Sequence, residues 1–125
     1  MLIEFSVENF KSFKDKTTFS MEKDIGDEHT NNVFKANNFD LLKSASIYGA
    51  NASGKSNLLK ALTTAILMVR NSNIIPIGGK WSGIVPFMLD EKSKNKPSMF
   101  EFIFIANGVK YRYSFSADNT KIYDE

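Results

Sequence analysis

The sequence predicts an α/β fold in which a strand, a glycine-rich loop and a helix stand beside antiparallel strands. A short predicted strand at residues 44–48 leads into the glycine-rich segment 49–56, and residues 57–70 then place apolar side chains at helical spacing. Two further stretches, 1–21 and 98–123, alternate between apolar and polar side chains, as strands with one covered face do. We therefore expect residues 1–125 to combine one helix-bearing unit at 44–70 with two antiparallel hairpin regions.

The composition describes one folded domain, or part of a larger one. Of the 125 residues 42% are hydrophobic, and 16 Lys and Arg stand against 14 Asp and Glu, which gives a net charge of +2. This balance does not point to nucleic acid or to a membrane surface. The sequence has no cysteine, which excludes disulfides, thiolate zinc sites and cysteine nucleophiles. Its apolar runs are too short to span a membrane, so we expect a cytoplasmic protein with no membrane partner.

The N-terminal 21 residues are expected to pair as a hairpin. Ile3, Phe5 and Val7 alternate with polar residues, which predicts an edge-type strand with these three side chains on one covered face. Residues 17–21 alternate again and would form the partner strand. Residues 22–38 are polar and rich in asparagine, so we expect a surface excursion there.

Residues 49–56 read GANASGKS and match the phosphate-binding loop pattern of Gly, four residues, then Gly-Lys-Ser/Thr. At ordinary residue frequencies such a match arises by chance in roughly a few chains of this length per thousand. Residues 44–48 are expected to form the strand that enters the loop. The helix after it has apolar residues at helical spacing, namely Leu58, Leu62, Ala65, Ile66 and Val69. This order predicts a P-loop nucleotide-binding fold.

The chemistry of such a loop favours a nucleotide phosphate. A glycine-rich turn lets backbone N–H groups point inward, and the helix that follows adds its unpaired N-terminal donors and positive dipole end. Lys55 would reach the β- and γ-phosphates of ATP, and the Ser56 hydroxyl would be an oxygen ligand for Mg²⁺. The residues expected to contact the nucleotide are Gly49, Asn51, Ala52, Ser53, Gly54, Lys55, Ser56 and Asn57.

The segments LIEFSVENFKSF and SIYGANASGKSNLLKAL resemble the N-terminal half of ABC-type ATPase heads in the RecF, SMC and OLD group. Within it they are most similar to bacterial AAA-family ATPases of abortive infection and phage defence. The later YRYSF stretch also fits, so the resemblance covers most of the chain and implies an antiparallel β subdomain beside the nucleotide-binding sheet. It further implies that Lys11 and Ser12 fold back over the nucleotide as phosphate-side contacts. Their chemistry alone predicts a solvated turn.

The resemblance also implies motifs that this sequence lacks. Such an ATPase uses a glutamine loop, a signature motif, a strand ending in Asp-Glu and a switch histidine. The chain has no glutamine, and its one histidine, His29, precedes the loop. We therefore expect one incomplete head, with its catalytic residues unknown, from a homodimeric ATPase that turns ATP and water into ADP and phosphate. Its output would involve DNA, phage defence or an associated nuclease or effector, and the chain alone would be incomplete for hydrolysis.

Two alternatives stand beside this interpretation. In the first, the apolar run before Asp90 and Glu91 is a Walker B strand and completes a compact P-loop NTPase. Pro86 and the neighbouring glycines and lysines favour a loop instead. In the second, the chain is a non-catalytic nucleic-acid-binding module, with its lysine loop 92–96 on phosphates and an aromatic sheet stacking bases.

The C-terminal third predicts a long hairpin around Asn107-Gly108, the strongest short hairpin signal in the chain. A two-residue turn would pair Phe104 with Tyr111, Phe102 with Tyr113 and Phe100 with Phe115, so that six aromatic rings share one face. We expect that aromatic stripe to be buried. The opposite face, with Glu101, Lys110, Arg112 and Ser114, is expected to meet water.

Overall fold

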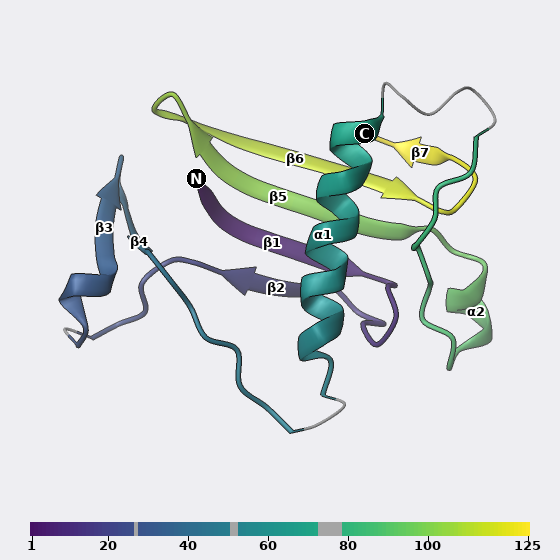
Figure 1. The fold of residues 1–125 in the computed structure, drawn as a ribbon, viewed down its shortest axis with the longest axis horizontal. Helices are drawn as coiled ribbons and strands as arrows, with labels where there is room; N and C mark the ends of the chain where they lie inside the picture. The colour runs from purple at the N-terminus through teal and green to yellow at the C-terminus, as the bar shows by residue number, and fades with distance from the viewer. Residues whose placement is uncertain (27, 51–52, 73–78) are drawn as a thin grey trace.

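A computed structural model describes residues 1–26, 28–50, 53–72 and 79–125. The long helix α1 crosses one face of a five-stranded antiparallel sheet (Figure 1). A small two-stranded sheet lies beside this large sheet. The large sheet has the order β2-β1-β5-β6-β7. The elements are β1 (Leu2–Glu8), β2 (Thr17–Ser20), β3 (Val33–Ala36), β4 (Phe39–Leu42), α1 (Lys55–Asn71), α2 (Glu91–Lys94), β5 (Ser98–Ala106), β6 (Val109–Ala117) and β7 (Ile122–Asp124). The mixed α/β class and both antiparallel hairpins are confirmed.

Strand β1 lies inside the sheet, so the prediction of an edge-type strand is wrong. It pairs with β2 on one side and with β5 on the other. Its second neighbour, β5, begins some ninety residues later in the chain. The alternation of side chains along β1 cannot indicate a pairing with so distant a strand. An irregularity in the ladder between Leu2 and Glu4 also turns Ile3 away from Phe5. Ile3 packs with Leu41 and Ile105, whereas Phe5 and Val7 pack beneath α1, so the three side chains do not share one face.

The β5–β6 hairpin has the predicted register. Ala106 pairs with Val109, and the three aromatic pairs follow in order along the two strands. Asn107 and Gly108 both adopt positive φ, at 51° and 76°, as a tight two-residue hairpin turn requires. The turn chemistry therefore sets the register of the two longest strands.

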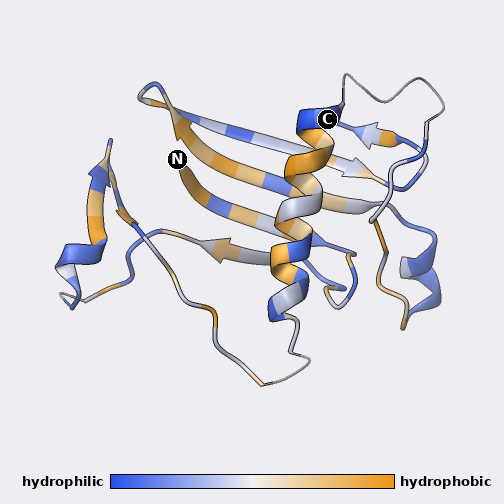
Figure 2. Cartoon of the chain, viewed as in Figure 1, coloured by the Kyte–Doolittle hydropathy of each residue, from blue (hydrophilic) through white to orange (hydrophobic). Residues whose placement is uncertain are grey.

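The main core lies between α1 and the sheet. Small side chains face the strands, since Ala61 and Ala65 are fully buried and Met68 is nearly so. Leu58 and Leu62 pack at the edge of this core. The helical spacing also predicted inward positions for Ile66 and Val69, but each is 42% exposed. Figure 2 shows hydrophobic residues gathered along α1, β1 and β5.

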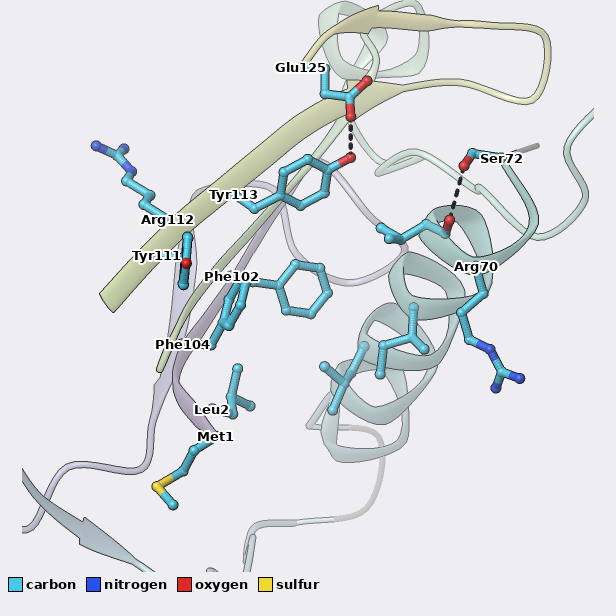
Figure 3. A pocket seen from close by; sticks show the side chains of 13 residues that line it. Met1, Leu2, Arg70, Ser72, Phe102, Phe104, Tyr111, Arg112, Tyr113 and Glu125 are labelled. Carbon is cyan, nitrogen blue, oxygen red and sulfur yellow. Dashed lines mark hydrogen bonds between the residues drawn. The ribbon is translucent and has the colours of Figure 1, made fainter. Parts of the chain in front are cut away.

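The aromatic stripe is buried at one end only. Phe100 and Phe115 are inside the core, whereas Tyr111 at the hairpin end is 45% exposed. Between this end and α1 lies a groove of about 760 Å³, which Figure 3 shows with Phe102, Phe104, Tyr111 and Tyr113 along its sheet wall. The Tyr113 hydroxyl donates to Glu125 at 2.7 Å, and burial together with this carboxylate raises the pKa of Tyr113 to about 12. The expectation of a fully buried stripe is therefore correct for its inner half.

The other face of the sheet is partly covered by the β3–β4 hairpin. The polar stretch 22–38, expected as a surface excursion, contains the short 3-10 helix Thr30–Asn32 and the strand β3. Leu41 of β4 is fully buried against Ile3 and Ile105. Glu101, expected in water, is only 5% exposed and is paired with Lys16 and Arg112. Within the described part of the chain, no helix has the length and apolar character needed to cross a membrane.

Candidate functional site

The glycine-rich segment ends where α1 begins. Gly54 is the N-cap of α1, with φ 93° and ψ 0°, and its carbonyl accepts the first helical hydrogen bond from Leu58 N at 3.0 Å. The first turn of α1 contains no acidic residue. The unpaired N–H groups and the positive dipole end of a 17-residue helix therefore face the loop without a competing carboxylate. This is the environment in which proteins bind anions.

The Lys55 ammonium group lies inside the loop. Its Nζ donates to the carbonyl oxygens of Gly49 at 2.7 Å and Ala50 at 2.6 Å, and lies 3.4 Å from the Ser53 hydroxyl. These contacts hold the ammonium group against the loop backbone. The sequence predicted a lysine turned toward the phosphates; in the structure its charge is bound by two carbonyl oxygens of the loop.

Ser53, Gly54, Lys55, Ser56 and Asn57 line one small hollow of about 250 Å³. Ser56 is exposed at the start of α1, where its hydroxyl is open to a ligand. Two residues predicted to contact the nucleotide, Asn51 and Ala52, lie outside the described residues. The other six predicted loop residues therefore converge at the N-terminus of α1.

Ser12 meets this loop from the N-terminal part of the chain. Its hydroxyl oxygen accepts a hydrogen bond from the Asn57 side-chain amide at 3.0 Å. The Phe13 ring lies beneath Gly54, within 3.6 Å of where a Cβ atom would stand. Lys11 has a different position: its ammonium group lies 5.7 Å from the Phe10 ring centroid, and its backbone N–H donates to Val85 O at 2.7 Å. The structure therefore brings Ser12 to the loop, whereas the contacts found for Lys11 join it to Phe10 and Val85.

Asn9 is a residue of this region that the sequence reasoning missed. It is 5% exposed, adopts φ 52° and binds four backbone groups through its side chain. An asparagine that follows a strand and opens a turn is a signal for such a conformation, because Asn tolerates positive φ better than most residues. That signal was available in the sequence.

The predicted strand at residues 44–48 is not formed. Residues 44–50 have no regular secondary structure and are exposed, with Tyr48 at 89%. A strand needs neighbours for its backbone N–H and C=O groups, and the sheets of the described residues contain no pairing for this segment. The local sequence of residues 44–48 cannot supply those neighbours.

The Walker B alternative is contradicted by the fold. Residues 84–90 form no strand, and the Asp90 carboxylate caps α2 by accepting from the Ser93 N–H at 3.0 Å and from its hydroxyl at 2.7 Å. These bonds from Ser93 lower the pKa of Asp90, and Lys14, 3.7 Å away, adds to the effect. Asp90 is therefore a helix cap. In the described parts of the chain no three His, Cys, Asp or Glu side chains are grouped to hold a metal.

The comparison with known families agrees with this geometry. The family model described as "AAA domain, putative AbiEii toxin, Type IV TA system" matches residues 44–125, which include the loop, α1 and the β5–β6 hairpin. The chain belongs to this family. The resemblance to AAA ATPases of abortive infection is thereby confirmed, and membership implies nucleotide binding. No sequence among curated proteins matches the chain. Ser12 and Asn9 precede the range matched by the AAA family, so their place at the loop comes from the structure.

Proposed function

We propose that this chain is the ATP-binding part of an ABC-type ATPase head and binds ATP at residues 49–57. The observation that carries the proposal is the position of Lys55, whose ammonium group donates to Gly49 and Ala50 at the N-terminus of α1. A polyphosphate entering this loop would meet a full positive charge, inward N–H groups and a helix dipole together. These are the features that phosphate-binding loops use.

Mg²⁺ fits the same site through Ser56. The hydroxyl is exposed at the start of α1, and Mg²⁺ in nucleotide sites takes one or two protein oxygens with the remainder from phosphates and water. Because no acidic cluster is present among the described residues, the metal would depend on the nucleotide for most of its ligands. When bound, it would neutralise charge on the β- and γ-phosphates. Ser56 would orient it from the loop.

The family description and the absent motifs support a proposal for the wider activity. We propose that complete heads pair around ATP and that this cycle serves an abortive-infection or toxin–antitoxin system, with DNA or a nuclease as the downstream target. The family match includes the loop, while the chain lacks glutamine and has no histidine after the loop. The glutamine loop and the switch histidine of such a head would then have to be supplied by residues other than these.

The nucleic-acid-binding module gains no support from the fold. A base-stacking platform needs a continuous open aromatic face, but the inner half of the stripe, with Phe100 and Phe115, is buried under α1, and the open part is confined to the end near Tyr111. The lysine stretch 92–96, expected as a loop, begins within the helix α2, where Lys94 is paired with Glu91. Nucleotide binding is therefore the function that the geometry favours.

A titration of the chain with ATP in the presence of Mg²⁺, by calorimetry, tests the proposal. Lys55→Ala should weaken binding at least about tenfold, because it removes the loop's full charge without opening a core cavity. Lys60→Ala is the matched control, since Lys60 is exposed on the same helix and should leave the affinity unchanged. Equal affinity in Lys55→Ala and wild type would overturn the assignment of the loop. Chelation of Mg²⁺ should reduce the affinity of the wild-type chain for ATP. The reduction should be smaller in Ser56→Ala, which lacks the proposed metal ligand.

A further inference from the structure

We propose that Asn9 is a positioning residue of the nucleotide site, acting through the turn that carries Ser12 to the loop. This inference rests on the proposed function, because it adds a residue to that same site. Asn9 is 5% exposed and sits directly after β1. It touches none of the loop residues in the described contacts, so its effect would travel through the turn that follows it.

The Asn9 side chain joins three separate segments. Its Nδ2 donates to the carbonyl oxygens of Ser93 and Lys96, both at 2.9 Å, and of Pro97 at 3.2 Å. Its Oδ1 accepts from the Phe87 N–H at 3.1 Å. The side chain therefore ties the end of β1 to the loop before α2, to α2 itself and to the chain between α2 and β5.

The Asn9 backbone is fixed as well. Its carbonyl accepts from the Ser98 hydroxyl at 2.5 Å, and its N–H donates to Lys14 O at 3.2 Å. Its φ of 52° is in the left-handed region, which few non-glycine residues enter without a supporting environment. Lys11 repeats this conformation at φ 50°. Asn9 thus sets the direction in which the chain leaves β1.

The turn that begins at Asn9 is short and is held by backbone hydrogen bonds. Phe10 and Phe13 exchange two backbone hydrogen bonds of 2.9 Å, which place Ser12 and Phe13 at its far end. From there the Ser12 hydroxyl bonds Asn57, and the Phe13 ring packs beneath Gly54. Because so few rotatable bonds separate Asn9 from these contacts, a change in its geometry should move Ser12 and Phe13 relative to the loop.

An amide is the side chain that this position requires. Three carbonyl oxygens and one N–H face this position, and the asparagine amide offers them two N–H donors and one acceptor oxygen with short reach. A carboxylate in its place would turn oxygen toward oxygen, while glycine would keep the backbone conformation and remove all four hydrogen bonds to the Asn9 side chain. The two substitutions therefore disturb the same contacts in different ways.

The first test needs no nucleotide. Amide NMR spectra of the chain are compared for wild type, Asn9→Asp, Asn9→Gly and Ser12→Ala, with Asn107→Asp as the control. Asn107 has φ 51° but is exposed at the β5–β6 turn, far from the loop in sequence and fold. The Asn9 variants should shift the signals of Gly54 and of the Asn57 side chain, in the same direction as Ser12→Ala does. Unchanged signals in a folded Asn9 variant would overturn the proposal, and Asn9→Gly serves if Asn9→Asp does not fold.

The second test is a double-mutant cycle on the dissociation constant for ATP with Mg²⁺. Asn9→Gly should weaken binding about tenfold in the wild-type background and less than about twofold when Ser12 is already alanine. Equal losses in both backgrounds would show that Asn9 contributes only general stability, and would contradict the proposed route. A wild-type chain that does not bind ATP would instead contradict the proposed function. The NMR comparison would still decide whether Asn9 positions Ser12 and Phe13 against the loop.

Discussion

A methyl group added at Gly54 would stand 3.0 Å from the hydroxyl oxygen of Ser12. Gly54 also has φ 93°, a conformation that residues with a side chain rarely adopt. Two features therefore require glycine at position 54, the second glycine of the phosphate-loop pattern. One is its backbone conformation, and the other is the close approach of the turn after β1. This relationship joins the N-terminal strand to the nucleotide loop.

We expect Gly54→Ala to destabilise the chain by about 1 to 3 kcal/mol and to weaken ATP binding, because it adds both strain and a close contact. Gly108→Ala is the matched control, since Gly108 has φ 76° but open space around its Cα. Urea unfolding of the two variants separates the effects. Losses of equal size would mean that the contact with Ser12 contributes nothing.

The chain alone should show no ATP hydrolysis above background. Phosphoryl transfer needs a positioned water and a metal-holding acid, and Asp90 is engaged as the cap of α2. Phosphate release should therefore be the same with and without the chain, at concentrations where ATP is bound. Steady release that disappears in Glu91→Gln would show that an acid of this region does catalyse the reaction.

Short-range chemistry was predictable from the sequence. The Asn107-Gly108 turn sets the whole β5–β6 register through two backbone conformations, and the pattern around Lys55 locates the start of α1. In both cases the information is held within a few residues. The family match agrees with the nucleotide-binding fold that the loop pattern had already predicted.

Long-range pairing was not predictable in the same way. The second neighbour of β1 and the burial of Glu101 depend on residues from distant parts of the chain, and alternation along one strand does not name a partner. The segment 44–48 shows the converse: it was predicted as a strand from its place before the loop, and it stays irregular because no described strand pairs with it. Asn9 shows both situations. Its position after a strand indicates a turn from the local sequence, whereas the four backbone groups that its side chain binds lie some eighty residues away and could not be predicted.

Truncations along the aromatic stripe should have graded costs. Phe100 is fully buried, so Phe100→Ala should destabilise the chain by about 3 to 5 kcal/mol. Tyr111 is 45% exposed and stacks on Phe104 with centroids 5.5 Å apart, so Tyr111→Ala should cost about 1 kcal/mol. Denaturant melts of both variants measure the difference. Equal costs would mean that something covers the outer end of the stripe in solution.

Glu101 should make the stability of the fold depend on pH. Its side chain is 7% exposed, with Lys16 Nζ 2.8 Å from one oxygen and Arg112 Nη2 2.6 Å from the other. The hydrogen bond from Lys16, followed by that from Arg112, lowers the pKa of Glu101 although burial opposes the shift. A carboxyl group whose pKa is lower when folded stabilises the fold above its unfolded pKa, and this stabilisation is lost as the pH falls through the folded pKa.

We therefore expect Glu101→Gln to be less stable than wild type at pH 7 by about 1 to 2 kcal/mol, because glutamine cannot accept two charge-assisted hydrogen bonds. The gap should persist down to about pH 4.5 and close below it, as the wild-type carboxylate takes up its proton. Urea unfolding at several pH values measures the gap. Glu91→Gln is the control: its side chain is 86% exposed and paired with Lys94 one turn along α2, so its gap should stay small at every pH. A Glu101→Gln gap that did not change with pH would mean that the side chain stabilises the fold by packing, since loss of the ion pair must follow protonation.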